Sequence, residues 1–205
     1  STVQLGRAST LVRLKRFEDA KPLLEQFLTS HANSPDTATC LAELAFCHAG
    51  MGQFNDARKR YDEFARLPQA KPSMLATTHR LAEMAYRGEQ RAWAAELFGV
   101  LAAKGNPPEY VARGLSGQAW CQFSSDDLAG SAATFLRLLE EFPSDPLAAE
   151  GALVRGKALE KLGEFDPALL MYRTLVDKFP DAPETPAAIL AAAELHERLK
   201  QHRDA

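Results

Sequence analysis

Cysteine is scarce in this sequence, with three among 205 residues. Cys40 and Cys47 lie seven residues apart, which on a helix places them on one face but about 10 Å apart along the axis. That distance is too long for a disulfide or a shared metal ion. Cys121 has no other cysteine near it in the sequence. We therefore predict small buried thiols rather than a redox or metal site.

The sequence also lacks a long apolar run and an excess of positive charge. No segment has the roughly eighteen apolar residues of a membrane-spanning helix, and the first residues, STVQLGRAST, contain no apolar signal-peptide core. The formal net charge is -3 at pH 7, so there is no positive field for a polyanion. We expect a soluble chain without membrane insertion or nucleic-acid binding. Its compartment stays open between the bacterial periplasm or envelope and the cytoplasm.

Motifs for catalysis are missing as well. His196 begins a His-Glu pair, but Lys200 stands where a zinc-protease helix needs its second histidine. Gly50 and Gly52 fall in a turn between predicted helices with no strand before them, so they are not a phosphate-binding loop. We therefore predict that the protein is not an enzyme and holds no cofactor or metal ion.

A repeat with a period of 37 residues runs along the chain. Its mark is a small residue, then a large apolar residue four positions later and another three positions after that. The small residues are Ala20, Ala57, Ala94, Ser131 and Ala168. The large residues are Leu24, Tyr61, Phe98, Phe135 and Tyr172, followed by Phe27, Phe64, Leu101, Leu138 and Leu175. Residues at this spacing share one helix face, so each occurrence of the pattern predicts a helix with a stripe of buried residues.

A second series of small residues has the same period in the preceding segments, which gives each repeat two helices. Its members are Ala8, Ala45, Ala82, Ala119, Gly156 and Ala193. Small residues let two helix axes approach closely, and the aromatic of the second helix fills the space beside them. Gly52 and Gly163 permit a left-handed end to the first helix, while Pro143 and Pro180 end the second.

The predicted fold class is all-α, an α-solenoid of five antiparallel helix pairs and a terminal capping helix in a single domain over residues 1–205. The pairs are expected at about 2–31, 37–68, 73–104, 109–142 and 146–179. The repeats are expected at about 1–36, 37–72, 73–108, 109–145 and 146–183, and the capping helix at 186–201. That helix is expected to cover one apolar side, formed by Ile189, Leu190, Ala193 and Leu195, and to turn a charged side to water.

The pattern resembles the tetratricopeptide repeat, whose second helix carries Ala-x3-Phe before a proline. Ser131 with Phe135 fits this pattern, and so does Ala168 with Tyr172. The first-helix positions are filled more loosely, by Leu41, Leu44, Ala45 and His48. The links after the fourth and fifth repeats, Phe-Pro-Ser-Asp-Pro and Phe-Pro-Asp-Ala-Pro, resemble those of bacterial cell-envelope repeat proteins such as the Tol-Pal coordinator and the barrel-assembly lipoprotein. The resemblance implies a right-handed superhelix.

In that family the first helices line a concave groove, and the resemblance implies which side chains face it here. The groove candidates are Phe46, His79, Glu83, Tyr86, Arg113, Trp120, Phe123 and Lys157. Aromatic anchors with a charged rim are typical of a peptide-binding interface. Exposure in the groove is expected for Phe46 and Tyr86, whereas packing between repeats explains Trp120 and Phe123 equally well.

The resemblance implies a scaffold or adaptor that binds a protein or peptide segment in its concave groove, in a bacterial envelope or multiprotein complex. Two alternatives stay open. In the first alternative, the chain is a helical structural or regulatory segment of a larger protein. In the second it forms a homo-oligomer through its terminal repeats, because the ends of a repeat array are open.

Overall fold

The computed structural model describes residues 2–204, and the side chains of residues 3–200. Ser1 and Ala205, the ends of the predicted domain, lie outside the described residues. The described part has eleven α-helices, a short 3-10 helix and no strand, which confirms the all-α class. The α-helices are α1 (Thr2–Arg13), α2 (Phe17–Ser30), α3 (Thr37–Gly50), α4 (Phe54–Ala65), α5 (Met74–Arg87), α6 (Arg91–Leu101), α7 (Pro108–Ser124), α8 (Leu128–Glu141), α9 (Leu147–Lys161), α10 (Phe165–Lys178) and α11 (Thr185–Asp204).

The helices gather into two compact units, Ser1–Leu97 and Phe98–Ala205, with the boundary inside α6. The ten helices from α1 to α10 fall within a few residues of the five predicted pairs. The single domain over residues 1–205 stays a prediction.

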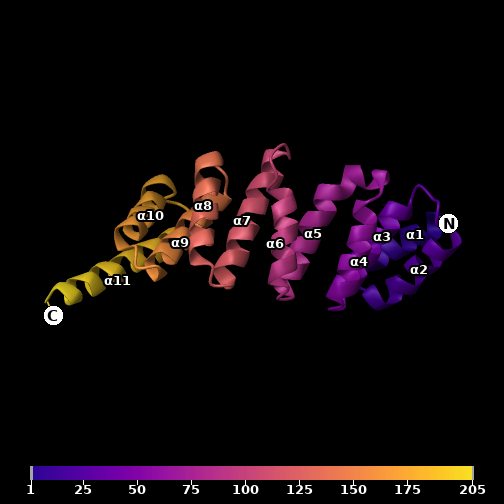
Figure 1. Cartoon of the computed structure of the whole chain (residues 1–205), viewed down its shortest axis with the longest axis horizontal. Helices are drawn as coiled ribbons and strands as arrows, with labels where there is room; N and C mark the ends of the chain where they lie inside the picture. The colour runs from indigo at the N-terminus through magenta and orange to yellow at the C-terminus, as the bar shows by residue number, and fades with distance from the viewer. Residues whose placement is uncertain (1, 205) are drawn as a thin grey trace. The chain divides into compact units, whose positions relative to one another are not determined.

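In the first unit, neighbouring helices pack in chain order, α1 on α2, α2 on α3 and α3 on α4 (Figure 1). The repeat stripe forms the core, because Leu24, Phe27 and Phe64 are fully buried. Leu44 and Ala45 on α3 are buried as well. The 3-10 helix η1 (Pro68–Ser73) links α4 to α5, and its two prolines keep the segment from continuing as an α-helix.

The cysteines are buried thiols, as predicted. Cys40 Sγ donates a hydrogen bond to the carbonyl oxygen of Leu24 over 3.3 Å. Burial, aided by the nearby Glu43 carboxylate, raises the pKa of Cys40 and of Cys47 to about 12. Both side chains therefore stay neutral and unreactive at pH 7.

The turns inside the repeats use a left-handed residue in every pair. Gly52 (φ 74°) and Gly163 (φ 80°) supply it in the second and fifth repeats. Lys15 (φ 59°), Glu89 (φ 61°) and Asp126 (φ 63°) supply it in the others. Glycine is favoured here but not obligatory, so the glycine pattern marks only two of the five turns.

In the second unit α7, α8, α9, α10 and α11 also pack in chain order (Figure 1). Phe135 and Leu138 of α8 are fully buried with Leu115 of α7. Tyr172 and Leu175 of α10 are fully buried in a second cluster, which extends to α11.

Of the four residues predicted to be covered on α11, only Leu195 is buried. Ala188 and Leu195, seven residues apart, are fully buried. Ile189 and Leu190 are 53% and 60% exposed, and Ala193 is exposed, so their predicted burial is wrong. The side that holds these three residues points away from the buried cluster. The periodic pattern assumes a following helix on that side, and no described helix follows α11.

No helix among the described residues combines the length and the apolar character needed to cross a membrane. Within the same residues, no three His, Cys, Asp or Glu side chains gather as metal ligands.

Candidate functional site

The predicted groove residues all lie on the first helices of their pairs, divided between the two units. In the first unit α3 carries Phe46, and α5 carries His79, Glu83 and Tyr86. In the second, α7 carries Arg113, Trp120 and Phe123, and α9 carries Lys157. They therefore form two sets of four, which we call the α3/α5 set and the α7/α9 set.

Phe46 is covered by a cation from the next first helix. The guanidinium carbon of Arg80, on α5, lies 4.0 Å from the centre of the Phe46 ring. Only 6% of Phe46 is exposed, so the expectation of an exposed aromatic is wrong. A cation this close to a ring face is attracted by its quadrupole, so Arg80 and Phe46 stabilise each other.

The other members of the α3/α5 set are engaged within α5 and its turn. His79 Nε2 lies 3.4 Å from Glu83 Oε1, and Arg87 lies 3.7 Å from the other Glu83 oxygen. Tyr86 is half-buried, and the guanidinium of Arg91 lies 4.1 Å from the centre of its ring. Arg91 also donates a hydrogen bond to the Tyr86 carbonyl oxygen. Arg91 therefore contacts both the ring and the backbone of Tyr86, so this ring is less available to a partner than the prediction assumed.

Glu43 is a half-buried residue whose Oε2 atom is buried, and the groove prediction missed it. It lies on α3 three residues before Phe46, a spacing that places both on one helix side. Ser9 donates it a hydrogen bond, and Arg80 and Arg13 act on it electrostatically. Its Oε2 atom has no hydrogen-bond partner among the described residues. Burial outweighs the nearby cations and raises the pKa of Glu43.

Replacing Glu43 with glutamine is expected to raise the thermal midpoint at pH 7. The folded pKa lies above the unfolded one, so the stability that the carboxyl contributes is lost as the pH rises through the folded pKa. Glutamine stays neutral throughout, so its advantage should be near zero at about pH 4, where the native carboxyl is largely protonated, and grow toward pH 7. Melting curves across this range test it, with exposed Glu25 changed to glutamine as the matched control. A lower midpoint for Glu43→Gln at pH 7 would show that pairing with Arg13 and Arg80 outweighs burial.

In the α7/α9 set the two aromatics lie side by side at the edge of the core. The Trp120 and Phe123 rings meet edge to face with centres 5.9 Å apart. Trp120 also meets the fully buried Phe135 in the same manner at 6.4 Å. Both Trp120 and Phe123 are only half-buried, so each packs against the core and still offers surface.

Charged residues of α7 and α9 complete the set, and one of them, Lys161, contacts the Phe123 ring, whereas the guanidinium of Arg113 lies 5.9 Å from the centre of the Tyr110 ring. Arg113 and Lys157 are exposed, and Lys161 Nζ lies 4.8 Å from the centre of the Phe123 ring. Glu160 of α9 is already engaged, because Tyr172 Oη donates to it over 2.9 Å and Arg198 over 2.7 Å. The prediction missed Lys161 and Glu160, although their spacing from Lys157 places all three on one side of α9.

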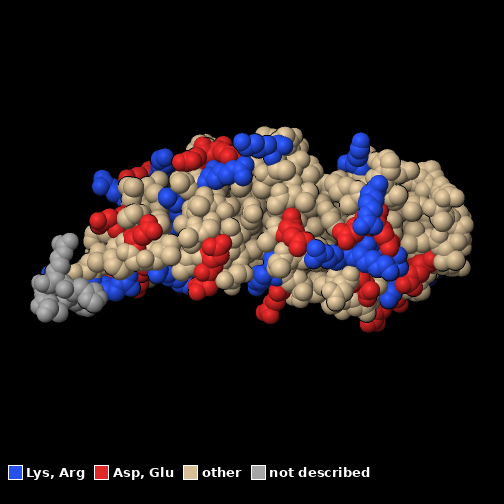
Figure 2. All heavy atoms as spheres, in the orientation of Figure 1, with Lys and Arg blue, Asp and Glu red and all other residues tan. Residues whose placement is uncertain are grey.

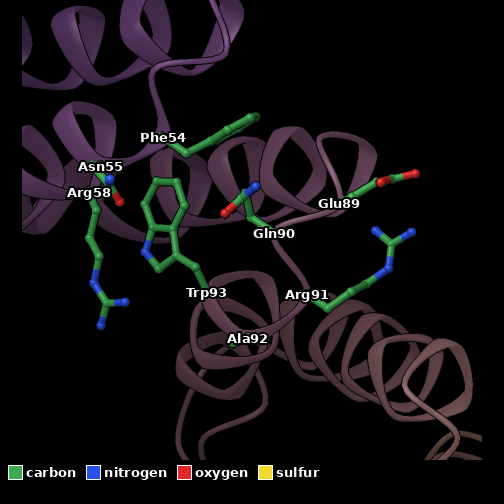
Figure 3. Close-up of a pocket in the computed structure, with 8 residues that line it drawn as sticks. All are labelled: Phe54, Asn55, Arg58, Glu89, Gln90, Arg91, Ala92 and Trp93. Atoms are coloured by element: carbon green, nitrogen blue, oxygen red, sulfur yellow. The ribbon is translucent and has the colours of Figure 1, made fainter.

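A shallow pocket of about 360 Å³ lies outside both sets, between α4 and the turn before α6 (Figure 3). Phe54 and Trp93 meet edge to face with ring centres 6.5 Å apart, and Arg58 pairs with Glu96 over 2.7 Å beside them. Lys and Arg gather over α4 in Figure 2 with acidic residues among them. The mixed charge gives this surface no preference for one sign of ligand.

A family model of the tetratricopeptide repeat matches residues 153–182. This segment holds most of α9, its turn and α10. No curated protein sequence matches the chain.

Solved structures of repeat proteins share the fold. A double mutant of MamA from RS-1 aligns with a TM-score of 0.63 and 12% identity, over 89% of this chain and 96% of that one. A putative kinesin light chain of Podospora anserina with nearly identical TPR-like repeats aligns with a TM-score of 0.61 and 18% identity, over 86% and 93%. PilF of Pseudomonas aeruginosa aligns with a TM-score of 0.56 and 16% identity, over 98% and 90%.

At these identities the structural likeness shows the fold alone. Tetratricopeptide repeats are typically non-catalytic scaffolds for protein interactions. The cell-envelope subtype stays a prediction. Residues 153–182 are a tetratricopeptide repeat, and the chain as a whole has the fold of the tetratricopeptide-repeat proteins.

Proposed function

We propose that this protein is a scaffold that binds a segment of a partner protein along the α7/α9 set. One observation carries the proposal: Trp120 and Phe123 lie side by side and half-buried, and the exposed Lys161 lies 4.8 Å from the centre of the Phe123 ring. Aromatic residues that are anchored in a core and still offer surface are the usual centres of binding energy in protein interfaces. The α3/α5 set supports binding less, because Arg80 covers Phe46 and Arg91 braces Tyr86.

The chemistry of the site favours a partner segment with an apolar side chain flanked by acidic ones. The apolar side chain would contact Trp120 and Phe123. Arg113 and Lys157 are exposed and can pair with carboxylates of a partner, whereas Glu160, on the same side of α9 as Lys157, is already paired with Arg198. Charged groups at the rim of an interface raise the association rate and set specificity, and their effect weakens with salt.

Reversing the charge at the rim tests the proposal without opening the core. Trp120→Ala would leave a cavity beside Phe135, so lost binding could be lost folding. Arg113→Glu with Lys157→Glu changes exposed side chains only. We expect the double variant to keep its melting midpoint and to bind the partner at least about tenfold more weakly at low salt.

The partner is first captured from host extract with the wild-type chain and is then purified, and its dissociation constant is measured for each variant. Lys104→Glu with Lys178→Glu makes the same charge change on exposed residues of the same unit away from α7 and α9, and should bind as the wild type does. If both double variants bind the partner equally weakly, the loss of affinity is caused by the change in net charge and not by these two positions. Unchanged binding in both would place the interface elsewhere.

A further inference from the structure

Arg155 is a cation of α9 that contacts both neighbouring helices and pairs with no carboxylate. Its Nε atom donates a hydrogen bond to the Ala132 carbonyl oxygen of α8 over 3.1 Å. Its Nη1 atom donates to the Met171 sulfur of α10 over 2.9 Å. Among the described residues, Arg155 takes part in no ion pair. One guanidinium therefore links α8, α9 and α10 of the second unit.

The guanidinium of Arg155 lacks a strong hydrogen-bond acceptor. A guanidinium is a charged group with several N–H donors, whereas a thioether sulfur such as that of Met171 is a weak acceptor. Arg155 is half-buried, and burial lowers its pKa although the Glu140 and Glu164 carboxylates act in the opposite direction. A charge that is withdrawn from water needs good hydrogen bonds in return. A polar oxygen in place of the bare sulfur would therefore suit Arg155 better.

Met171 is a methionine that an oxidant in solvent can reach. Its side chain is half-buried and packs against the cluster that holds Tyr172 and Leu175. Oxidation of such a methionine normally disrupts a core, because the sulfoxide is polar where the thioether was apolar. At Met171 the added oxygen would have a charged donor beside it. The methionine side chain is unbranched and adaptable, so it can shift to admit one more atom.

We propose that Met171 is a reversible oxidation site whose sulfoxide is bound by Arg155, so that oxidation strengthens the packing of α10 on α9. The oxidant is a peroxide. A lone pair of the sulfur attacks one peroxide oxygen, the S–O bond forms as the O–O bond breaks, and the other oxygen leaves as hydroxide. That hydroxide takes the proton of the transferred OH group and becomes water. The sulfur is oxidised by two electrons and the peroxide is reduced by two.

In the oxidised protein the sulfoxide oxygen replaces the sulfur as the acceptor from Arg155 Nη1. Hydrogen bonds from a charged donor to a polar oxygen are among the strong ones in proteins. The new bond would hold α10 to α9 beside the buried Tyr172. This inference concerns the packing of the second unit and is independent of the partner proposed for the α7/α9 set.

The test uses a background variant with leucine at the other three methionines, Met51, Met74 and Met84, which leaves Met171 as the only methionine. Exchange of methionine for leucine nearly conserves volume, so this variant should fold. Hydrogen peroxide should convert Met171 to the sulfoxide, which mass spectrometry of the peptide that contains it identifies. The melting midpoint should then rise by about 2 to 4 °C, as expected for one added hydrogen bond.

Arg155→Leu in the same background tests whether the guanidinium holds the new oxygen. Without its donor, the sulfoxide should lower the midpoint of this variant. Each variant is compared with its own reduced form, so the cost of removing Arg155 itself cancels. Arg173→Leu is the matched control, because Arg173 is a well-exposed cation of α10 that pairs with Asp177. Its midpoint should rise on oxidation as that of the background does.

A second measurement follows the return to methionine and does not depend on stability. Methionine sulfoxide reductase removes the oxygen, and it must reach an oxygen that Arg155 holds in the folded protein. Reduction should therefore be at least about tenfold slower in the background variant than in Arg155→Leu. Equal rates in the two would show that Arg155 does not bind the sulfoxide, and no reduction in either would show that the oxidation is not reversible.

Two further results would overturn the proposal. The first is a Met171 that peroxide leaves unmodified while it oxidises the other methionines of the wild-type chain. The second is a midpoint that falls on oxidation by the same amount with and without Arg155, which would make Met171 an ordinary site of oxidative damage.

Discussion

Replacing Gly114 with alanine is expected to lower the free energy of unfolding by about 2 to 3 kcal/mol. Helix propensity alone predicts the opposite, because alanine in a helix interior is favoured over glycine by about 1 kcal/mol. Gly114 lies in the middle of α7, where a Cβ would come within 2.4 Å of the Ala102 nitrogen and 2.7 Å of the Phe98 carbonyl oxygen. Both are backbone atoms, which cannot rotate out of the way, so α7 would have to move.

Urea unfolding followed by circular dichroism measures this change, and Gly6 provides the matched control. Gly6 lies inside α1, and a Cβ added there would meet nothing within 4 Å. Gly6→Ala should therefore stabilise the protein by about 0.5 to 1 kcal/mol. If both substitutions stabilise the protein, the packing of α7 does not require a residue without a Cβ atom at position 114.

The repeat predicted the fold because its signals are local to each helix. Small residues every 37 positions mark the places where helices approach most closely. The structure buries Ala8, Ala45, Ala82 and Ala119 completely. A residue at such a position is buried by the helix that follows it in the chain, so spacing along the sequence is enough to find it.

The same reasoning failed at α11 because burial depends on a neighbour and not on the pattern itself. Ala193 continues the small-residue series and is exposed, since no described helix packs on that side. Ile189 and Leu190 are apolar like their counterparts on α9 and are exposed for the same reason. Periodicity shows which residues are suited to burial, and only the packing shows which are buried.

The candidate site was predicted less completely than the fold. The first-helix positions were correctly assigned to α3, α5, α7 and α9. The contacts that decide their exposure were missed, because they join residues far apart in the sequence. Arg80 covers Phe46 from the next repeat, and Lys161 reaches Phe123 from another pair. Long cationic side chains can reach in several directions, so no sequence spacing specifies where such a side chain lies.

The largest single loss of stability in the second unit is expected from Tyr172→Ala, about 3 to 5 kcal/mol. Tyr172 is fully buried, and its ring lies directly against Gly156, where an added Cβ would come within 2.4 Å of it. The change removes the packing of α10 on α9 together with the hydrogen bond to Glu160.

Tyr172→Phe separates the two contributions, because it keeps the ring and removes only the hydroxyl. Glu160 would still pair with Arg198 over 2.7 Å, so the expected loss is smaller, about 1 kcal/mol. Urea unfolding of the two variants beside the wild type gives both values. If Tyr172→Phe costs as much as Tyr172→Ala, the hydrogen-bonded group of Tyr172, Glu160 and Arg198 holds α9, α10 and α11 together, and the ring packing contributes little. If the loss is large for alanine alone, the aromatic of the repeat is the main contact between α9 and α10.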